Sequence, residues 1–190
     1  MEMYFKNIYK VLFEPGVAFI DIKNQVLSSS QAVFTLVWVN IVLYSLKYMF
    51  SATVLNAFLY LCSLLFYLVS IVFSWVLLTV LFEYIAKIFD KSGKFKLLFC
   101  LSSYSVIPWI FMAPMQLIKN VGDVGYFFAV LFEVLIYLWT IFLYVKSLEV
   151  TYDLSFSRAI MLIFLPIVGM LFAIPWIIGF FIKIGYIFTV

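Results

Sequence analysis

Long apolar stretches separated by short polar segments dominate the pattern of hydrophobic and polar positions along the chain. A helix needs about 20 apolar residues to cross the hydrocarbon core of a bilayer. Five stretches meet this need, and they are residues 31–50, 54–86, 97–118, 124–145 and 159–182. Backbone in lipid must satisfy its own hydrogen bonds, and these stretches lack the alternation of barrel strands. The pattern therefore predicts an all-α, polytopic membrane bundle of five transmembrane helices.

The first thirty residues instead have apolar positions spaced as on one side of a helix. The apolar positions on this side are Phe5, Ile8, Tyr9 and Leu12. Lys6, Asn7 and Lys10 fall on the other side. We therefore expect an amphipathic, cytoplasmic N-terminal segment over residues 1–30 and a membrane domain over residues 31–190. Two placements of the segment stay open, one in the lipid headgroup layer and one packed on the cytoplasmic ends of the bundle.

Composition agrees with a lipid environment. Hydrophobic residues make up 67% of the 190 residues, against roughly 45–50% in soluble domains. Charged residues make up 11%, against roughly 25% in soluble domains. A soluble domain of this size could not bury so much apolar surface, because its area scales almost as fast as its mass. The length leaves room for one compact membrane domain.

The distribution of lysine and arginine between alternate connections predicts the orientation. Nine of these residues fall on one side of the predicted spans and three on the other. Four of the nine form one basic loop, and they are Lys87, Lys91, Lys94 and Lys96. Because cytoplasmic loops carry the excess of positive charge, we expect a cytoplasmic N-terminus and, after five crossings, an outside C-terminus. The strong excess of lysine over arginine is typical of an AT-rich prokaryotic genome. We therefore expect the protein in the cell membrane of a prokaryote.

Glu133 is the most informative single residue, because it lies about midway along the fourth predicted span. A carboxylate there costs about 2.5–3.5 kcal/mol on insertion scales, so it must be protonated, paired or facing a wet cavity. Asn40, near the centre of the first span, is the expected hydrogen-bond partner. Tyr137 lies one helical turn from Glu133, and Tyr104 is a further polar candidate within the spans. Glu133 is either a coupling or proton site or a neutral acid that fixes helix packing, and we favour packing.

Prolines interrupt two of the predicted spans. They are Pro108 and Pro114 in the third span and Pro166 and Pro175 in the fifth. Each proline frees a backbone carbonyl, which can bind an ion or simply accompany a kink in the helix. We expect kinks.

The sequence offers few groups for catalysis. It contains no histidine, which excludes histidine bases, Ser–His and Cys–His pairs and histidine-ligated metals. It has no P-loop and no HExxH motif, and Cys62 and Cys100 cannot form a metal cluster by themselves. We therefore expect no enzyme, no cofactor and no metal. A net charge of +3 is too small to indicate a nucleic-acid partner.

Several segments resemble one known family. Gly93-Lys94-Phe95 and Ser103-Tyr104-Ser105-Val106-Ile107-Pro108 are similar to the loop and third span of the Yip1-domain family. The fourth span from Tyr137-Leu138-Trp139 and the connection Leu154-Ser155-Phe156-Ser157-Arg158-Ala159 also resemble this family. The segment Phe13-Glu14-Pro15-Gly16 is similar to the start of its prokaryotic members.

Eukaryotic members of this family associate with Rab-type GTPases in vesicle traffic. Only about thirty residues precede the first predicted span here, so the longer N-terminal region of those members has no counterpart and a small GTPase is not an expected partner. The resemblance implies a non-catalytic membrane scaffold or an accessory subunit of a larger membrane machine.

Two functional hypotheses follow. The first is a non-enzymatic membrane protein that acts as a scaffold or accessory subunit, related to transport or export, with the bilayer and other membrane proteins or itself as partners. The alternative is a small transporter, channel or lipid-moving protein that uses Glu133 within the bundle.

Overall fold

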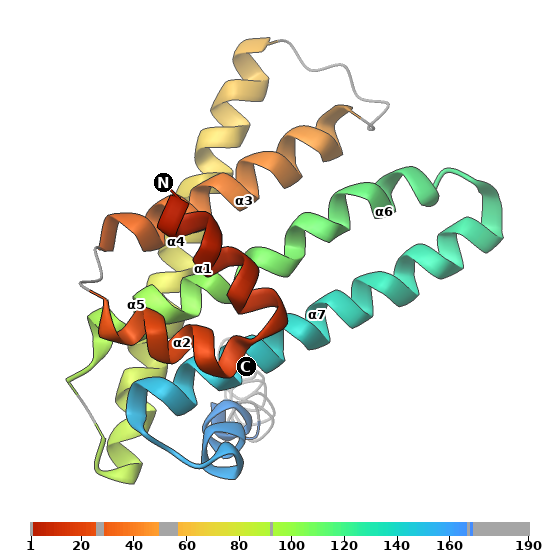
Figure 1. The fold of residues 1–190 in the computed structure, drawn as a ribbon. Coiled ribbons are helices and arrows are strands. Elements are labelled where there is room, and N and C mark those ends of the chain that lie inside the picture. The colour runs from red at the N-terminus through yellow and green to blue at the C-terminus, as the bar shows by residue number, and fades with distance from the viewer. Residues whose placement is uncertain (1, 26–28, 50–56, 92, 167, 169–190) are drawn as a thin grey trace, which may run out of the picture.

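The computed structural model describes residues 2–25, 29–49, 57–91, 93–166 and 168 (Figure 1). The elements in chain order are α1 (Glu2–Phe13), α2 (Pro15–Asn24), α3 (Ser29–Met49), α4 (Ala57–Ala86), η1 (Lys87–Phe89), α5 (Phe95–Ser103), η2 (Tyr104–Phe111), α6 (Met112–Ile118) and α7 (Gly122–Tyr152). A further apolar helix, Phe156–Pro166, follows α7. The predicted all-α architecture is confirmed for the described residues.

Three helical stretches are long and apolar enough to cross a membrane, namely Ala57–Phe89, Phe95–Ile118 and Gly122–Tyr152. They coincide with the second, third and fourth predicted spans. Two shorter apolar helices, Ser30–Leu46 and Phe156–Pro166, overlap the first and fifth predicted spans. The fold is therefore a membrane helical bundle, and the count of five crossings stays a prediction. Pro175 lies outside the described residues.

The helical stretch Phe95–Ile118, formed by α5, η2 and α6, occupies the centre of the bundle. Every residue from 98 to 108 is buried, and α5 and η2 together contact α1, α2, α3, α4 and α7. Small side chains at Ser102, Ser103 and Ser105 allow neighbouring helices to approach closely. The hydroxyl of Ser102 also accepts a hydrogen bond from the indole N–H of Trp75 in α4, at 3.1 Å. The tyrosine- and serine-containing segment is therefore part of the core.

Pro108 lies inside η2, where the chain leaves the α-helical form for a 3₁₀-helix over eight residues. Proline lacks a backbone N–H and its ring collides with the carbonyl four residues earlier, so a regular α-helix cannot pass through it. The chain therefore departs from the α-helical form around Pro108, and the kinks expected at the prolines stay a prediction. Pro114 lies in α6, and Pro166 is the last residue of the helix that follows α7.

Two helical hairpins extend from this centre, α3 with α4 and α6 with α7. In Figure 1 the C-terminal end of α3, the start of α4 and the turn between α6 and α7 lie at the end of the molecule opposite the loop that follows α4 and the turn that follows α7. We call the end formed by residues 87–96 and 153–158 the basic end, because it contains all four lysines of the predicted basic loop together with Arg158.

The N-terminal helices α1 and α2 pack against α5, η2 and α7. The buried contact groups Val11, Ala18, Phe19 and Ile22 with Leu101, Tyr104, Ile107 and Leu143. The segment therefore packs on the bundle, and its position relative to the lipid headgroup layer stays a prediction.

The orientation of α1 differs in part from the predicted one. Tyr9, assigned to the apolar side, is 65% exposed, and Asn7, assigned to the polar side, is only 7% exposed. Asn7 tolerates burial because its side-chain amide donates a hydrogen bond to the side-chain oxygen of Gln25, at 3.0 Å. A polar group paired in this way avoids the cost of an unsatisfied donor.

Candidate functional site

Glu83, near the end of α4, joins three segments at the basic end. Its carboxylate accepts hydrogen bonds from the backbone N–H groups of Gly93 and Lys94, the second at 3.2 Å. It also accepts a hydrogen bond from the hydroxyl of Tyr152 at the end of α7. Gly93 adopts a positive φ of 77°, a backbone conformation that glycine reaches without steric cost. The basic loop is thereby held against α4 and α7.

Asp153 forms a second junction beside the first. It caps the C-terminus of α7 in the left-handed conformation, and its two carboxylate oxygens pair with Lys23 of α2 at 2.7 Å and with Lys94 at 3.0 Å. Lys23 also donates to the carbonyl of Val150, at 2.8 Å. Hydrogen bonds from Lys23 and then Lys94 lower the pKa of Asp153 to about 2. The carboxylate therefore stays ionised and ties three elements together.

The four lysines of the predicted basic loop have different surroundings. Lys94 is engaged by Asp153, whereas Lys87 and Lys96 are exposed and Lys91 is half-buried. The ammonium of Lys87 lies over the ring of Tyr84, at 5.3 Å from its centroid. Lys94 therefore ties the basic loop to the end of α7.

Glu133 forms an ion pair, which is one of the three states predicted from the sequence (protonated, paired or facing a wet cavity). Its Oε1 atom lies 2.6 Å from Nζ of Lys119 and accepts a second, longer hydrogen bond from Nε2 of Gln116, at 3.3 Å. Both partners belong to the end of α6 and the turn after it, so the contact closes the α6–α7 hairpin. The side chains are only partly exposed, 25% for Lys119 and 20% for Glu133.

Asn40, expected beside Glu133, has other partners in the structure. Its amide donates to the carbonyl of Leu36 at 2.8 Å, and its oxygen accepts a hydrogen bond from the hydroxyl of Tyr67 at 3.0 Å. Tyr67 packs on Tyr44, whose hydroxyl donates to Ser63 at 2.7 Å. Asn40 is fully buried. The expected pairing with Glu133 is therefore corrected, because Asn40 joins α3 to α4 rather than to α7.

The two tyrosine candidates have different surroundings. Tyr104 is 1% exposed and belongs to the core beneath α1 and α2. Tyr137 is 52% exposed and contacts Trp109 edge-on, with ring centroids 6.5 Å apart. The structure therefore does not gather the predicted polar candidates into one site.

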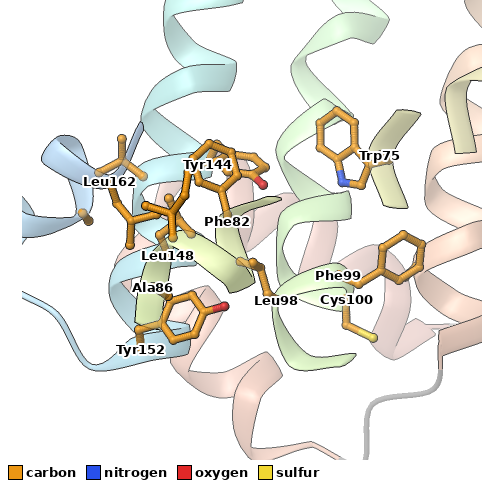
Figure 2. Packing of buried hydrophobic residues seen from close by; sticks show 14 of the residues in the cluster. Trp75, Phe82, Ala86, Leu98, Phe99, Cys100, Tyr144, Leu148, Tyr152 and Leu162 are labelled. Carbon is orange, nitrogen blue, oxygen red and sulfur yellow. The ribbon is translucent and has the colours of Figure 1, made fainter. Parts of the chain in front are cut away.

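An apolar pocket of about 420 Å³ lies beside Tyr137. It is lined by residues of α4, η2, α7 and the helix that follows, namely Trp75, Leu78, Leu81, Phe82, Trp109, Tyr137, Thr140, Ile141, Tyr144, Ile163 and Pro166. Figure 2 shows Tyr144 and Phe82 packed together near Trp75. The volume of this pocket falls within the roughly 300–1,000 Å³ of small-molecule sites.

Sequence reasoning missed Lys119 as the partner of Glu133 and Asp153 as a junction. Lys119 follows α6 and Glu133 lies in α7, so the turn between the two helices, and no spacing along one helix, brings the two residues together. The useful signal is that the third and fourth spans must form a hairpin, which brings the end of one span beside the start of the next. For Asp153 the signal is an isolated acid at the end of a long apolar helix.

The chain was compared with known protein families, curated proteins and solved structures. The family model for the Yip1 domain matches residues 9–177. No match was found among curated proteins or among solved structures. The matched range includes α2 to α7, the central serine- and tyrosine-containing segment and both junctions at the basic end. The chain is a membrane protein that belongs to the Yip1 domain family.

Proposed function

We propose that this protein is a non-enzymatic integral membrane scaffold, or an accessory subunit of a larger membrane assembly. The observation that carries the proposal is the surface of α4. Helix α4 is 30 residues long. None of its residues from 57 to 74 is buried. Its exposed side chains include Leu65, Phe66, Val69 and Phe73, each at least 62% exposed. Half of a membrane helix is thus available for contacts with another protein.

The use of charged side chains supports the same proposal. Glu83, Glu133 and Asp153 each link separate segments of the fold through ion pairs or hydrogen bonds. Charges in such positions stabilise one arrangement of helices. The end of α4 that contains Glu83 is therefore held in place by its neighbours.

The alternative is a transporter, channel or lipid-moving protein that uses Glu133. The partly exposed carboxylate within a candidate span favours it. Its pairing with Lys119 weighs against it, because the pair already satisfies the charge that a coupled ion would have to neutralise. In reconstituted vesicles, Glu133→Gln would abolish flux or shift its pH dependence if this alternative holds, and an absence of flux with the unchanged protein would exclude it.

We further propose that the basic end faces the cytoplasm of a prokaryotic cell and that the protein lies in the plasma membrane. The excess of lysine at this end supports the orientation. Reporter fusions after residue 90 and after residue 121 would test it, since the first should report the cytoplasm and the second the outside.

Photo-crosslinking in native membranes tests the scaffold proposal. A photoreactive residue in place of Phe66 on α4 should yield one defined protein adduct, either a partner or a second copy. The matched control replaces Leu138 on α7, which is 56% exposed and lies outside the proposed contact surface. Lipid adducts alone at both positions, together with a lone monomer after gentle extraction, would contradict the proposal.

A further inference from the structure

The N-terminal hairpin, which α1 and α2 form, has apolar side chains on two opposite sides. Its inner side is buried against the bundle, where Phe19 and Ile22 share a cluster with Leu143 of α7. Large apolar side chains are nevertheless more than half exposed at Tyr9, Phe13, Val17 and Ile20. We call these four side chains the outer face.

The outer face lies opposite the buried side of each helix. Tyr9 and Phe13 are one turn apart on α1, and their ring centroids are 4.8 Å apart. The buried Val11 is two positions from each of them, a step that turns a helix by about 200°. The same step separates the exposed Ile20 of α2 from the buried Ile22. On both helices the outer face therefore points away from the bundle.

The surroundings of the outer face carry no excess of charge. Lys10 and Asp21 form an ion pair at 2.5 Å across the hairpin. Lys6 and Glu14 are exposed, and their charges have opposite signs. Aromatic and aliphatic side chains without a net charge suit contact with hydrocarbon, and tyrosine in particular is enriched where membrane meets water.

The length of α7 gives the level of the hydrocarbon boundary. The helix has 31 residues and is therefore about 46 Å long, whereas the hydrocarbon core is about 30 Å thick. Apart from the paired Glu133, its uncharged part is residues 124–145, between Asp123 and Lys146. At the basic end, the boundary of the hydrocarbon therefore falls near Lys146.

The N-terminal hairpin contacts α7 on both sides of this boundary. Leu143 belongs to the cluster buried under the hairpin, and Lys23 donates to the carbonyl of Val150 at 2.8 Å. Both contacts precede the end of α7, so the hairpin packs against the side of this helix (Figure 1). Leu138 and Phe142, which are 56% and 41% exposed, bring the apolar surface of α7 to the same level. The outer face therefore continues the apolar surface of the bundle.

We propose that the outer face is a membrane-contact surface. It lies at the boundary between headgroups and acyl chains, in the leaflet at the basic end. The apolar faces of helices that lie in a membrane surface enter this boundary by about 5–10 Å. Burial of apolar area in hydrocarbon, rather than attraction to anionic headgroups, holds the face there. The inference goes beyond the scaffold proposal and does not depend on it.

Spin-label accessibility in lipid vesicles tests this proposal. The full chain, with Cys62→Ala and Cys100→Ala, would carry one nitroxide label at a time, on Phe13→Cys or on Ile20→Cys. Relaxation of the label by oxygen, which concentrates in hydrocarbon, is compared with relaxation by a water-soluble nickel complex. The ratio of the two gives the depth of the label.

Two further labels calibrate the depth. Leu138→Cys on α7 represents the hydrocarbon, and Lys96→Cys, at an exposed position at the start of α5, represents the aqueous side. We expect the labels on the outer face to give ratios between those of the two controls, at a depth of about 5–10 Å. The depth should be the same in vesicles of phosphatidylcholine and in vesicles that also contain phosphatidylglycerol.

A charge on the outer face should change this depth. Val17→Glu should shift the label at Ile20→Cys toward the aqueous value, because a carboxylate resists burial in hydrocarbon. Asn24→Glu is the matched control, since Asn24 is exposed on the same helix but lies outside the outer face, and it should leave the depth unchanged. A thermal unfolding scan establishes that each labelled variant is folded.

Other environments give different results. A ratio equal to that of Lys96→Cys at both outer-face positions would place the face in water, and weak relaxation by both reagents would mean that another copy of the chain covers it. Either result overturns the proposal. A depth that appears only with phosphatidylglycerol, or that Val17→Glu leaves unchanged, would overturn the apolar basis of the contact.

Discussion

The hydroxyl of Tyr152, at the end of α7, donates a hydrogen bond to the carboxylate of Glu83, near the end of α4. The two residues are 69 positions apart in sequence, and Tyr152 is completely buried. Glu83 also holds the loop at Lys94, which in turn contacts Asp153. The helix ends at the basic end are thus coupled through one set of hydrogen bonds.

Tyr152→Phe should destabilise the protein by about 1.5–3 kcal/mol, the usual range for a hydrogen bond to a charged group. Tyr144→Phe is the matched control, because the buried Tyr144 hydroxyl has no hydrogen-bond partner among the described residues. Its removal should be neutral or stabilising. Reversible unfolding in mixed micelles measures both. Equal destabilisation by the two variants would contradict the assigned roles.

Asp153→Asn should weaken the attachment of α2 and of the basic loop. The effect should be small, roughly 0–1 kcal/mol for each ion pair, because the Asp153 side chain is 61% exposed. The folded-state pKa of about 2 lies below the ordinary value of 3.8. The stabilisation is therefore complete above about pH 4 and is lost as the pH falls toward 2.

The measurement is the difference in unfolding free energy between parent and Asp153→Asn as a function of pH. This difference cancels the titration of the other carboxylates. It should shrink between about pH 4 and pH 2, and a difference that stays constant over this range would show that Asp153 is not held in its charged form by Lys23 and Lys94.

Lys119→Met should destabilise the α6–α7 hairpin by up to about 3 kcal/mol, because it leaves the carboxylate of Glu133 without its cation. The double variant Lys119→Met with Glu133→Gln should recover much of this loss, since it removes both charges. Unfolding of the parent, both single variants and the double variant gives the coupling energy. Additive losses would show that the ion pair contributes nothing.

Gly125→Ala should destabilise the same hairpin by about 1–3 kcal/mol. A Cβ atom at Gly125 would overlap the backbone carbonyl oxygen of Ile118, and backbone cannot move aside cheaply. Gly16 in α2 is the matched control, because its Cβ would meet nothing within 4 Å. Gly16→Ala should be stabilising by up to about 1 kcal/mol. Thermal midpoints of the two variants should therefore move in opposite directions.

Hydrophobic patterning predicted the helices well but not their partners. The third predicted span, 97–118, agrees closely with the helical stretch Phe95–Ile118. Its central position was not predictable, because lipid and protein both favour apolar side chains. Residues 98–108 are buried by protein, whereas residues 57–74 of α4 have no buried member, although the stretch Ala57–Phe89 is the more apolar one, with a mean hydropathy of 2.5 against 1.6 for Phe95–Ile118.

The candidate site residues show the same difference between what the sequence predicts and what the packing of helices decides. A carboxylate within a span predicts that Glu133 needs a partner, and the structure supplies one. That partner is Lys119 rather than Asn40, because the α6–α7 hairpin sets the contact across two helices. Asn40 in α3 faces Tyr67 in α4 instead.

By itself, the sequence determined that the chain is an apolar, helical membrane protein, roughly where its long apolar helices lie, and that Glu133 needs a partner. These properties follow from local composition, since apolar length and an isolated charge have a cost in hydrocarbon wherever the neighbouring helices lie. Only the tertiary structure decided that Tyr152 meets Glu83 and that Lys94 meets Asp153. Such pairs depend on how the helices cross and in what register, and an apolar helix surface leaves both undetermined until packing selects one arrangement.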